Sequence, residues 1–259
     1  MLSLSSRQSF ILNRVVDTFI ETGHPVSSQA VACASPAPVS SATIRHEMGS
    51  LEDTGYLVQA HHSSGRIPTD RGYRHYLDHG IASYELKSSP SHELSARFLN
   101  RFKTRDDTQN FVDEFASVLS ELSRQVGVLL VPDSKSDDGE NRVQMKTQGL
   151  RYLLENPECQ NSATLRPLVH AVEEKKKLKQ WIGQHASEAS PQVFIGAEHE
   201  FDDLQDYTIV TARYDSGVEG FSGAVAVIGL KRMAYSKVLP VVSEMAQLMG
   251  ATFQAMRKG

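Results

Sequence analysis

The chain has 259 residues, of which 40% are hydrophobic and 22% are charged, and its formal net charge is −4. This length is enough for two domains of ordinary size, each with its own core. No stretch approaches the roughly 20 apolar residues of a membrane span, so the composition excludes an integral helical membrane protein. The slight acidity means that any nucleic-acid binding must come from a local surface and not from the total charge.

The first 35 residues predict two helices. Residues 7–21 place Ile11, Val15 and Phe19 at helical spacing, and the following Thr-Gly-His-Pro ends the pattern. A second, short helix begins after Val26, with Ser27 as its cap. The prolines in Ser-Pro-Ala-Pro-Val then form a turn before the next helix.

The stretch from residue 40 to residue 76 organises this half of the chain. Ser40 or Ser41 can cap a helix in which Ile44, Met48 and Leu51 form a narrow apolar stripe. The small and hydrogen-bonding residues that point away from the stripe suit insertion into a DNA major groove; they are Ala42, Thr43, Arg45, His46 and Gly49.

A hairpin is predicted to follow this helix. Gly55 ends the helix, residues 56–59 read as a strand, and residues 61–69 supply the tip and the return strand. We expect Arg66, and with it Ser64, to touch the DNA backbone or the minor groove. His61 and His62 are interpreted as polar residues at the hairpin edge and not as metal ligands, because neighbours on a strand point to opposite faces.

The second half of the chain predicts an α+β domain. Ser-Ser-Pro-Ser at 88–91 marks a linker, and Phe111, Phe115, Val118 and Leu122 fall at helical spacing. Strands are predicted at 126–131, 192–196, 207–213 and 224–229, and helices near 165–172, 175–182 and 235–253. The lysine run at 175–179 is interpreted as a solvated helix face, with a phosphate patch as the alternative.

Several blocks of the sequence closely resemble the heat-inducible transcription repressor family HrcA. They are PVSSQAV, VSSATIRHEMGSLEDTGYL and SSGRIPTDRGYRHY in the first part, and VFIGAEHEF and GAVAVIGLKRMAYSKVLPVV near the other end. The resemblance implies a winged helix-turn-helix domain over 1–87, a linker over 88–106 and a GAF-like domain over 107–259. It also implies repression of chaperone operons through the inverted-repeat operator called CIRCE, release on heat stress, and maintenance by the chaperonin GroEL.

The chain departs from the family in one place. Only a short polar bridge, DSKSDDGE at 133–140, stands where typical members carry further strands and an inserted domain used for dimerisation. We therefore expect a shortened GAF-like domain whose sheet is interrupted at this point. A homodimer is still expected, because one recognition helix reads only a few base pairs.

No pattern of nucleophile, base, P-loop or clustered metal ligands is present, so we expect no enzyme activity, cofactor or metal. The alternatives that remain open are a ligand-responsive regulator with a small-molecule pocket, an enzyme with an accessory winged helix, and a protein-binding winged helix. Two cysteines far apart in sequence and no signal-peptide pattern lead us to expect a reduced, cytoplasmic protein without membrane contact.

Overall fold

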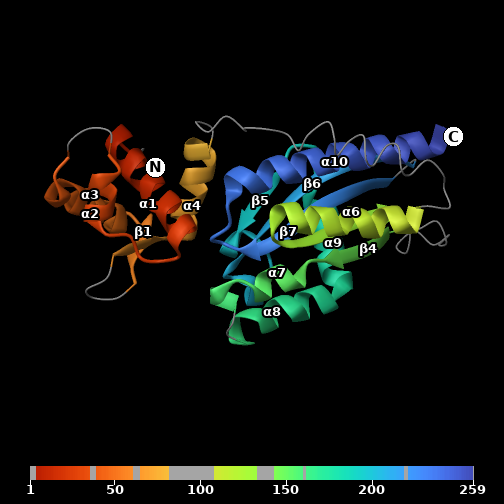
Figure 1. The fold of residues 1–259 in the computed structure, drawn as a ribbon, viewed down its shortest axis with the longest axis horizontal. Helices are drawn as coiled ribbons and strands as arrows, with labels where there is room; N and C mark the ends of the chain where they lie inside the picture. Colours follow the sequence, from red (N-terminus) through yellow and green to blue (C-terminus); the bar gives the residue numbers. More distant parts are fainter. Residues whose placement is uncertain are drawn as a thin grey trace. The chain divides into compact units, whose positions relative to one another are not determined.

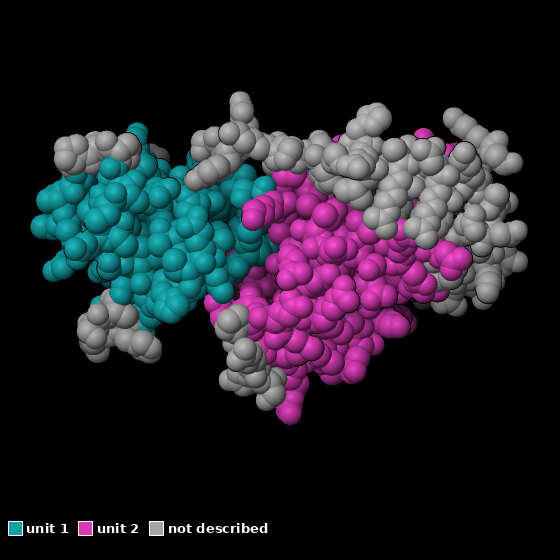
Figure 2. Space-filling model, in the orientation of Figure 1, with its two compact units in different colours: residues 1–86, 232–236 teal, residues 87–231, 237–259 magenta. Residues whose placement is uncertain are grey.

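The structure is a computed structural model that describes residues 4–35, 39–60, 65–81, 108–132, 143–159, 162–218 and 221–258. The chain divides into two compact units (Figure 2): one comprises residues 1–86 with 232–236, and the other residues 87–231 with 237–259. The linker predicted at 88–106 lies outside the described residues. None of the described helices is long and apolar enough to cross a membrane.

The first unit is built from helices and one hairpin (Figure 1). Its elements are α1 (Ser6–Thr22), α2 (Ser28–Cys33), α3 (Ser41–Asp53), β1 (Leu57–Gln59), β2 (Arg66–Pro68), α4 (Asp70–His75) and a π-helical turn, η1 (Tyr76–Gly80). The predicted first helix and the Ser27 cap are confirmed: the Ser27 side chain accepts from the backbone N–H of Ala30. Gly23, with φ 71°, ends α1 in the left-handed region that glycine tolerates best.

Burial of two apolar stripes holds these helices together. On α1 the buried residues recur in adjacent pairs one turn apart, and on α3 they are the predicted stripe. The side chains that are at most 1% exposed are Ile11, Leu12, Val15 and Val16 of α1 and Ile44, Met48 and Leu51 of α3. Three helices followed by a two-stranded antiparallel hairpin are the elements, in order, of a winged helix.

The second unit is a five-stranded antiparallel sheet between two helical layers, which confirms the α+β class. Its helices are α6 (Thr108–Ser123), α7 (Leu150–Leu154), α8 (Ser162–Glu173), α9 (Lys175–His185) and α10 (Tyr235–Lys258). Its strands are β3 (Val126–Pro132), β4 (Val143–Gln148), β5 (Gln192–Ile195), β6 (Tyr207–Val218) and β7 (Phe221–Leu230). Short 3-10 turns lie at Pro157–Cys159, Gly196–Glu198 and Asp202–Leu204. The strand order is β4-β3-β7-β6-β5.

Each face of the sheet is covered by its own helices. On one face, Leu178, Trp181 and Ile182 of α9 belong to a buried cluster with side chains of α8, β3, β6 and β7. Helices α6 and α10 lie together, because the rings of Phe111 and Phe253 are 5.9 Å apart. The ring of Phe253 also stacks on Tyr214 of β6 at 5.8 Å, which places this helical pair on the sheet as well.

One sequence-based expectation for this sheet is wrong, and one strand was missed. The sheet is not interrupted where the chain is shortened, because β3 and β4 pair directly from Gly127↔Gln148 to Pro132↔Val143. Strand β4 itself was not predicted. The short bridge therefore connects two neighbouring strands of one sheet.

Candidate nucleic-acid interface

Helix α3 is amphipathic in the way that a recognition helix requires. Its N-cap is Ser40, whose hydroxyl accepts from the backbone N–H of Thr43 at 3.1 Å and also pairs with the Thr43 hydroxyl at 2.9 Å. Arg45 and His46 are exposed, whereas Ile44, on the opposite side, is 1% exposed. The cap fixes the first turn, and the buried stripe determines which side chains face solvent.

Ser41 lies at the helix entrance, as predicted, but its hydroxyl is engaged within the protein. Its Oγ lies 3.0 Å from Ser28 Oγ, so the contact joins the first residue of α3 to the first residue of α2. Thr43 is half-buried and uses its hydroxyl on Ser40. Of the predicted residues on α3, Arg45 and His46 make no hydrogen bond or ion pair with other described residues and are therefore free to meet a ligand.

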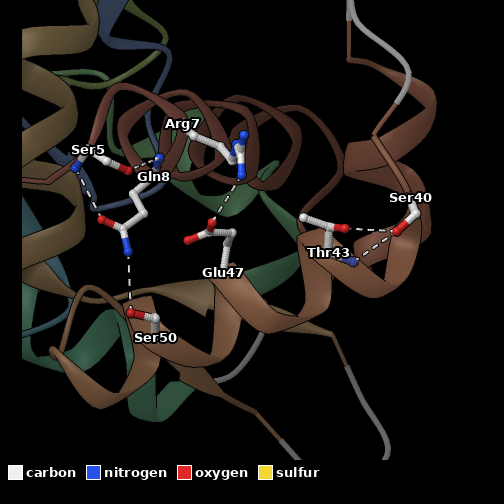
Figure 3. A network of polar contacts seen from close by, with 7 residues as sticks. All are labelled: Ser5, Arg7, Gln8, Ser40, Thr43, Glu47 and Ser50. Carbon is white, nitrogen blue, oxygen red and sulfur yellow. Dashed lines mark hydrogen bonds and ion pairs between the residues drawn. The ribbon is translucent and has the colours of Figure 1, made fainter.

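A polar network ties the start of α1 to α3 (Figure 3). Ser5 and Gln8 form a reciprocal capping box at the N-terminus of α1, and Gln8 Nε2 also donates to Ser50 Oγ of α3 at 3.3 Å. Arg7 Nη1 lies 3.7 Å from Glu47 Oε1. Sequence reasoning missed these contacts, although the Ser-x-x-Gln spacing is a local signal for the capping box.

The hairpin is fixed to the same helix by a carboxylate. Glu52, in the last turn of α3, accepts from Arg66 Nε at 2.9 Å and from the Gln59 backbone N–H at 3.2 Å. The Arg66 side chain is only 18% exposed. Ser64, His61 and His62, which belong to the predicted tip, lie outside the described residues.

The remaining candidate groups supply little chemistry. Cys33 and Cys159 are free thiols, the first exposed and the second buried, and burial raises the pKa of the Cys159 thiol. In the part of the chain that the structure describes, no three His, Cys, Asp or Glu side chains are grouped so that they could hold a metal ion. The lysines at 175–177 are exposed on α9, as predicted for a solvated face.

Comparisons with known proteins agree on one family. Residues 135–239 match the family described as "HrcA protein C terminal domain". Two curated relatives, both named "Heat-inducible transcription repressor HrcA", are 25% identical (Geobacter sulfurreducens; 96% of this chain and 98% of the relative) and 24% identical (Shouchella clausii; 94% and 96%). The first alignment runs over 341 positions, more than the 259 residues of this chain, so that relative carries segments that this chain lacks.

The fold has a counterpart among solved structures. A crystal structure titled as a hypothetical protein at 2.2 Å resolution superposes with a TM-score of 0.74, covering 96% of this chain and 100% of its own. At 20% identity this likeness concerns the fold alone. With the family match in the second half and relatives of nearly full-length coverage that share one name, the chain is similar to the HrcA family of heat-inducible transcription repressors.

Proposed function

We propose that this repressor binds an inverted-repeat operator of the CIRCE type upstream of chaperone genes, as a homodimer in the cytoplasm. The observation that carries the proposal is the division of α3 into a buried apolar stripe and a free polar face with Arg45 and His46. An arginine fork can read guanine N7 and O6 in the major groove, and an imidazole can donate to or accept from neighbouring base edges or phosphates. Thr43 lies beside them, and Ser40 and Ser41 hold the helix entrance.

The dimer follows from the reading capacity of a single helix. One recognition helix reads only a few base pairs, so selection of a single operator in a genome needs two helices one or more helical turns apart. We infer from the sequence that this chain lacks the inserted dimerisation domain of the family. We propose that it pairs through its GAF-like unit instead. The wing residues Ser64 and Arg66 are the remaining candidates for contacts to the DNA backbone or the minor groove.

Heat release requires an equilibrium between a binding and a non-binding state. We propose that the second unit is the less stable part and that GroEL returns the repressor to its binding state after stress. Loss of operator affinity should then coincide with a structural transition of the second unit on heating. Operator affinity that disappears far below any such transition would contradict this mechanism.

The decisive experiment is a binding titration with three duplexes. These are the full inverted repeat, a single half-site, and a scrambled duplex of equal composition, with the mass of the protein and of the complex measured at each concentration. We expect a dimer that binds the full repeat at least roughly 10³-fold more tightly than the scrambled duplex, the ratio typical of specific over non-specific DNA binding. A protein that stays monomeric and binds all three duplexes equally would refute the proposal.

Within the residues that the structure describes, the alternative of a ligand-responsive regulator gains no specific support. The sheet face under α8 and α9 is filled by Leu178, Trp181 and Ile182, none of which is more than 4% exposed. A cavity of about 280 Å³ lies between α6 and α7, and its lining residue Ser120 already uses its hydroxyl on Ala116, Gln148 and Gly127. The geometry of α3 therefore remains the best guide to function.

A further inference from the structure

We propose that Glu52 is a positioning residue that holds the wing hairpin on the recognition helix, and that Arg66 serves DNA binding through Glu52 and not through its own contact to DNA. This inference rests on the proposed DNA-binding function and concerns how the two DNA-facing elements are kept at a fixed angle. It reassigns Arg66, which the sequence alone presents as a phosphate or minor-groove contact.

The Glu52 carboxylate joins three elements with its two oxygens. Oε2 accepts from Nε of Arg66 in β2 at 2.9 Å, and Oε1 accepts from the backbone N–H of Gln59 in β1 at 3.2 Å. Both strands of the hairpin are thus bonded to one side chain in the last turn of α3. Charge-assisted hydrogen bonds of this kind are stronger than neutral ones and hold their partners in a defined geometry.

The strand pairing explains why the Gln59 N–H is available. Gln59 and Arg66 are opposite each other in the hairpin, but Arg66 exchanges both of its backbone hydrogen bonds, each 2.9 Å, with Val26 on its other side. Gln59 and Arg66 are therefore a non-hydrogen-bonded pair, and the Gln59 N–H points away from β2. The Glu52 carboxylate accepts a hydrogen bond from this N–H on the side away from β2.

The return strand is held from its other edge as well. A Cβ added to Gly65 would lie 2.3 Å from the Val26 carbonyl oxygen, so the backbone before Arg66 runs directly against the segment between α1 and α2. Val26 fixes one edge of the hairpin and Glu52 the other. Without the Glu52 contact, the hairpin loses its side-chain attachment to the last turn of α3, and we expect its position relative to α3 to become less well defined.

The burial and pairing of Arg66 argue against a direct phosphate contact. Its side chain is 18% exposed, and that of Glu52 is 31% exposed. A side chain that binds phosphate brings an uncompensated positive charge and displaces a counterion from DNA. Arg66 is already neutralised by a carboxylate 2.9 Å away, whereas Arg45 faces solvent without such a partner among the described residues.

The two roles predict opposite results for Glu52→Gln. If Arg66 touches phosphate, this substitution removes a competing carboxylate and a negative charge near DNA, so operator affinity stays the same or rises. If Glu52 positions the hairpin, the same substitution weakens binding. Asp53→Asn is the matched control, because Asp53 is the adjacent exposed acid and has no hydrogen bond or ion pair among the described residues.

The test compares wild type, Glu52→Gln, Arg66→Gln, the double variant and Asp53→Asn in operator titrations at several salt concentrations. We expect each single change at Glu52 or Arg66 to weaken binding roughly tenfold, the loss typical of one charge-assisted hydrogen bond. The double variant should be no weaker than the weaker single variant, the salt dependence should stay that of wild type, and Asp53→Asn should bind at least as tightly as wild type. Arg66→Lys, which keeps the charge but not the Nε donor, should behave like Arg66→Gln.

The inference is overturned if Glu52→Gln binds as tightly as wild type, if Arg66→Gln lowers the slope of the salt dependence by about one phosphate contact per subunit, or if the two losses add. Circular dichroism and thermal unfolding identify any variant that fails to fold, and Glu52→Asp, one methylene shorter, then replaces it. If wild type shows no operator preference, the proposed function fails. Amide hydrogen exchange then decides whether Glu52 holds the hairpin on α3. If the Gln59 backbone amide exchanges faster in Glu52→Gln than in Asp53→Asn, the positioning role of Glu52 is supported. Equal exchange rates in the two variants refute it.

Discussion

Arg45 is the residue whose loss should separate DNA binding from folding. It lies on the exposed face of α3, one position after the buried Ile44, and forms no hydrogen bond or ion pair with other described residues. Arg45→Gln should therefore change the free energy of unfolding by no more than about 0.5 kcal/mol, as is usual for exposed sites. The melting temperature should stay within a few degrees of that of wild type.

The effect on operator binding should be large by comparison. An arginine that reads guanine through two hydrogen bonds contributes about 1–3 kcal/mol of discrimination at its half-site. A symmetric dimer uses the residue twice, so the loss is roughly 2–6 kcal/mol, or roughly 30-fold to 10⁴-fold in the dissociation constant. Specificity should also relax at one base pair in each half-site, at symmetric positions.

Fluorescence anisotropy with a labelled operator measures both effects, when repeated with duplexes substituted at one symmetric pair of positions at a time. Arg166→Gln is the control, because Arg166 is exposed on α8 in the second unit and the substitution removes the same charge. We expect the control to bind like wild type. Equal affinities for Arg45→Gln, Arg166→Gln and wild type would refute the assignment of α3 as the reading helix.

Two further changes test the supporting structure. Ser40→Ala removes the N-cap of α3, which accepts from the Thr43 N–H, and should lower the free energy of unfolding by about 1 kcal/mol in thermal or denaturant melts; the exposed Ser6→Ala should have no such effect. Burial raises the pKa of Tyr214, whose hydroxyl donates to the Leu130 carbonyl at 2.9 Å. Because the folded pKa exceeds the unfolded value of about 10, the Tyr214 contribution to stability is complete below that pH and is lost above it. Tyr214→Phe should thus release one proton fewer on alkaline unfolding, measured by ultraviolet titration, and a Tyr214 that ionises normally in the folded protein would contradict this.

Local signals in the sequence were sufficient for α3 and its N-cap. Ser40 and Thr43 are three residues apart, and the buried stripe recurs once per turn, so both features are readable from neighbouring residues. The exposed positions of Arg45 and His46 follow from the same periodicity. Their role in DNA binding remains a prediction, but their orientation needed no knowledge of the rest of the fold.

Strand β4 lacked a comparable signal for a physical reason. It is the edge strand of the sheet and follows a polar loop, and of its six residues only Met145 is buried. Val143, Met145 and Thr147 alternate with Gln144 and Lys146, but a half-covered edge strand carries fewer apolar residues than a central one such as β3, which is buried from Val126 to Val131. The missed strand led directly to the wrong expectation of an interrupted sheet.

Glu52 illustrates how a positional argument can recover part of what pattern reading misses. At about 100° per residue, position 52 lies about 40° around α3 from Met48, at the border of the buried stripe and not on the open face. A carboxylate at such a border loses water on folding and requires donors to compensate. The hairpin supplies these donors. They are the backbone N–H of Gln59, seven residues after Glu52, and the guanidinium of Arg66, fourteen residues after it. The positions of Glu52 on the helix and Arg66 on the wing therefore indicate an ion pair within the protein before either residue indicates a contact to DNA.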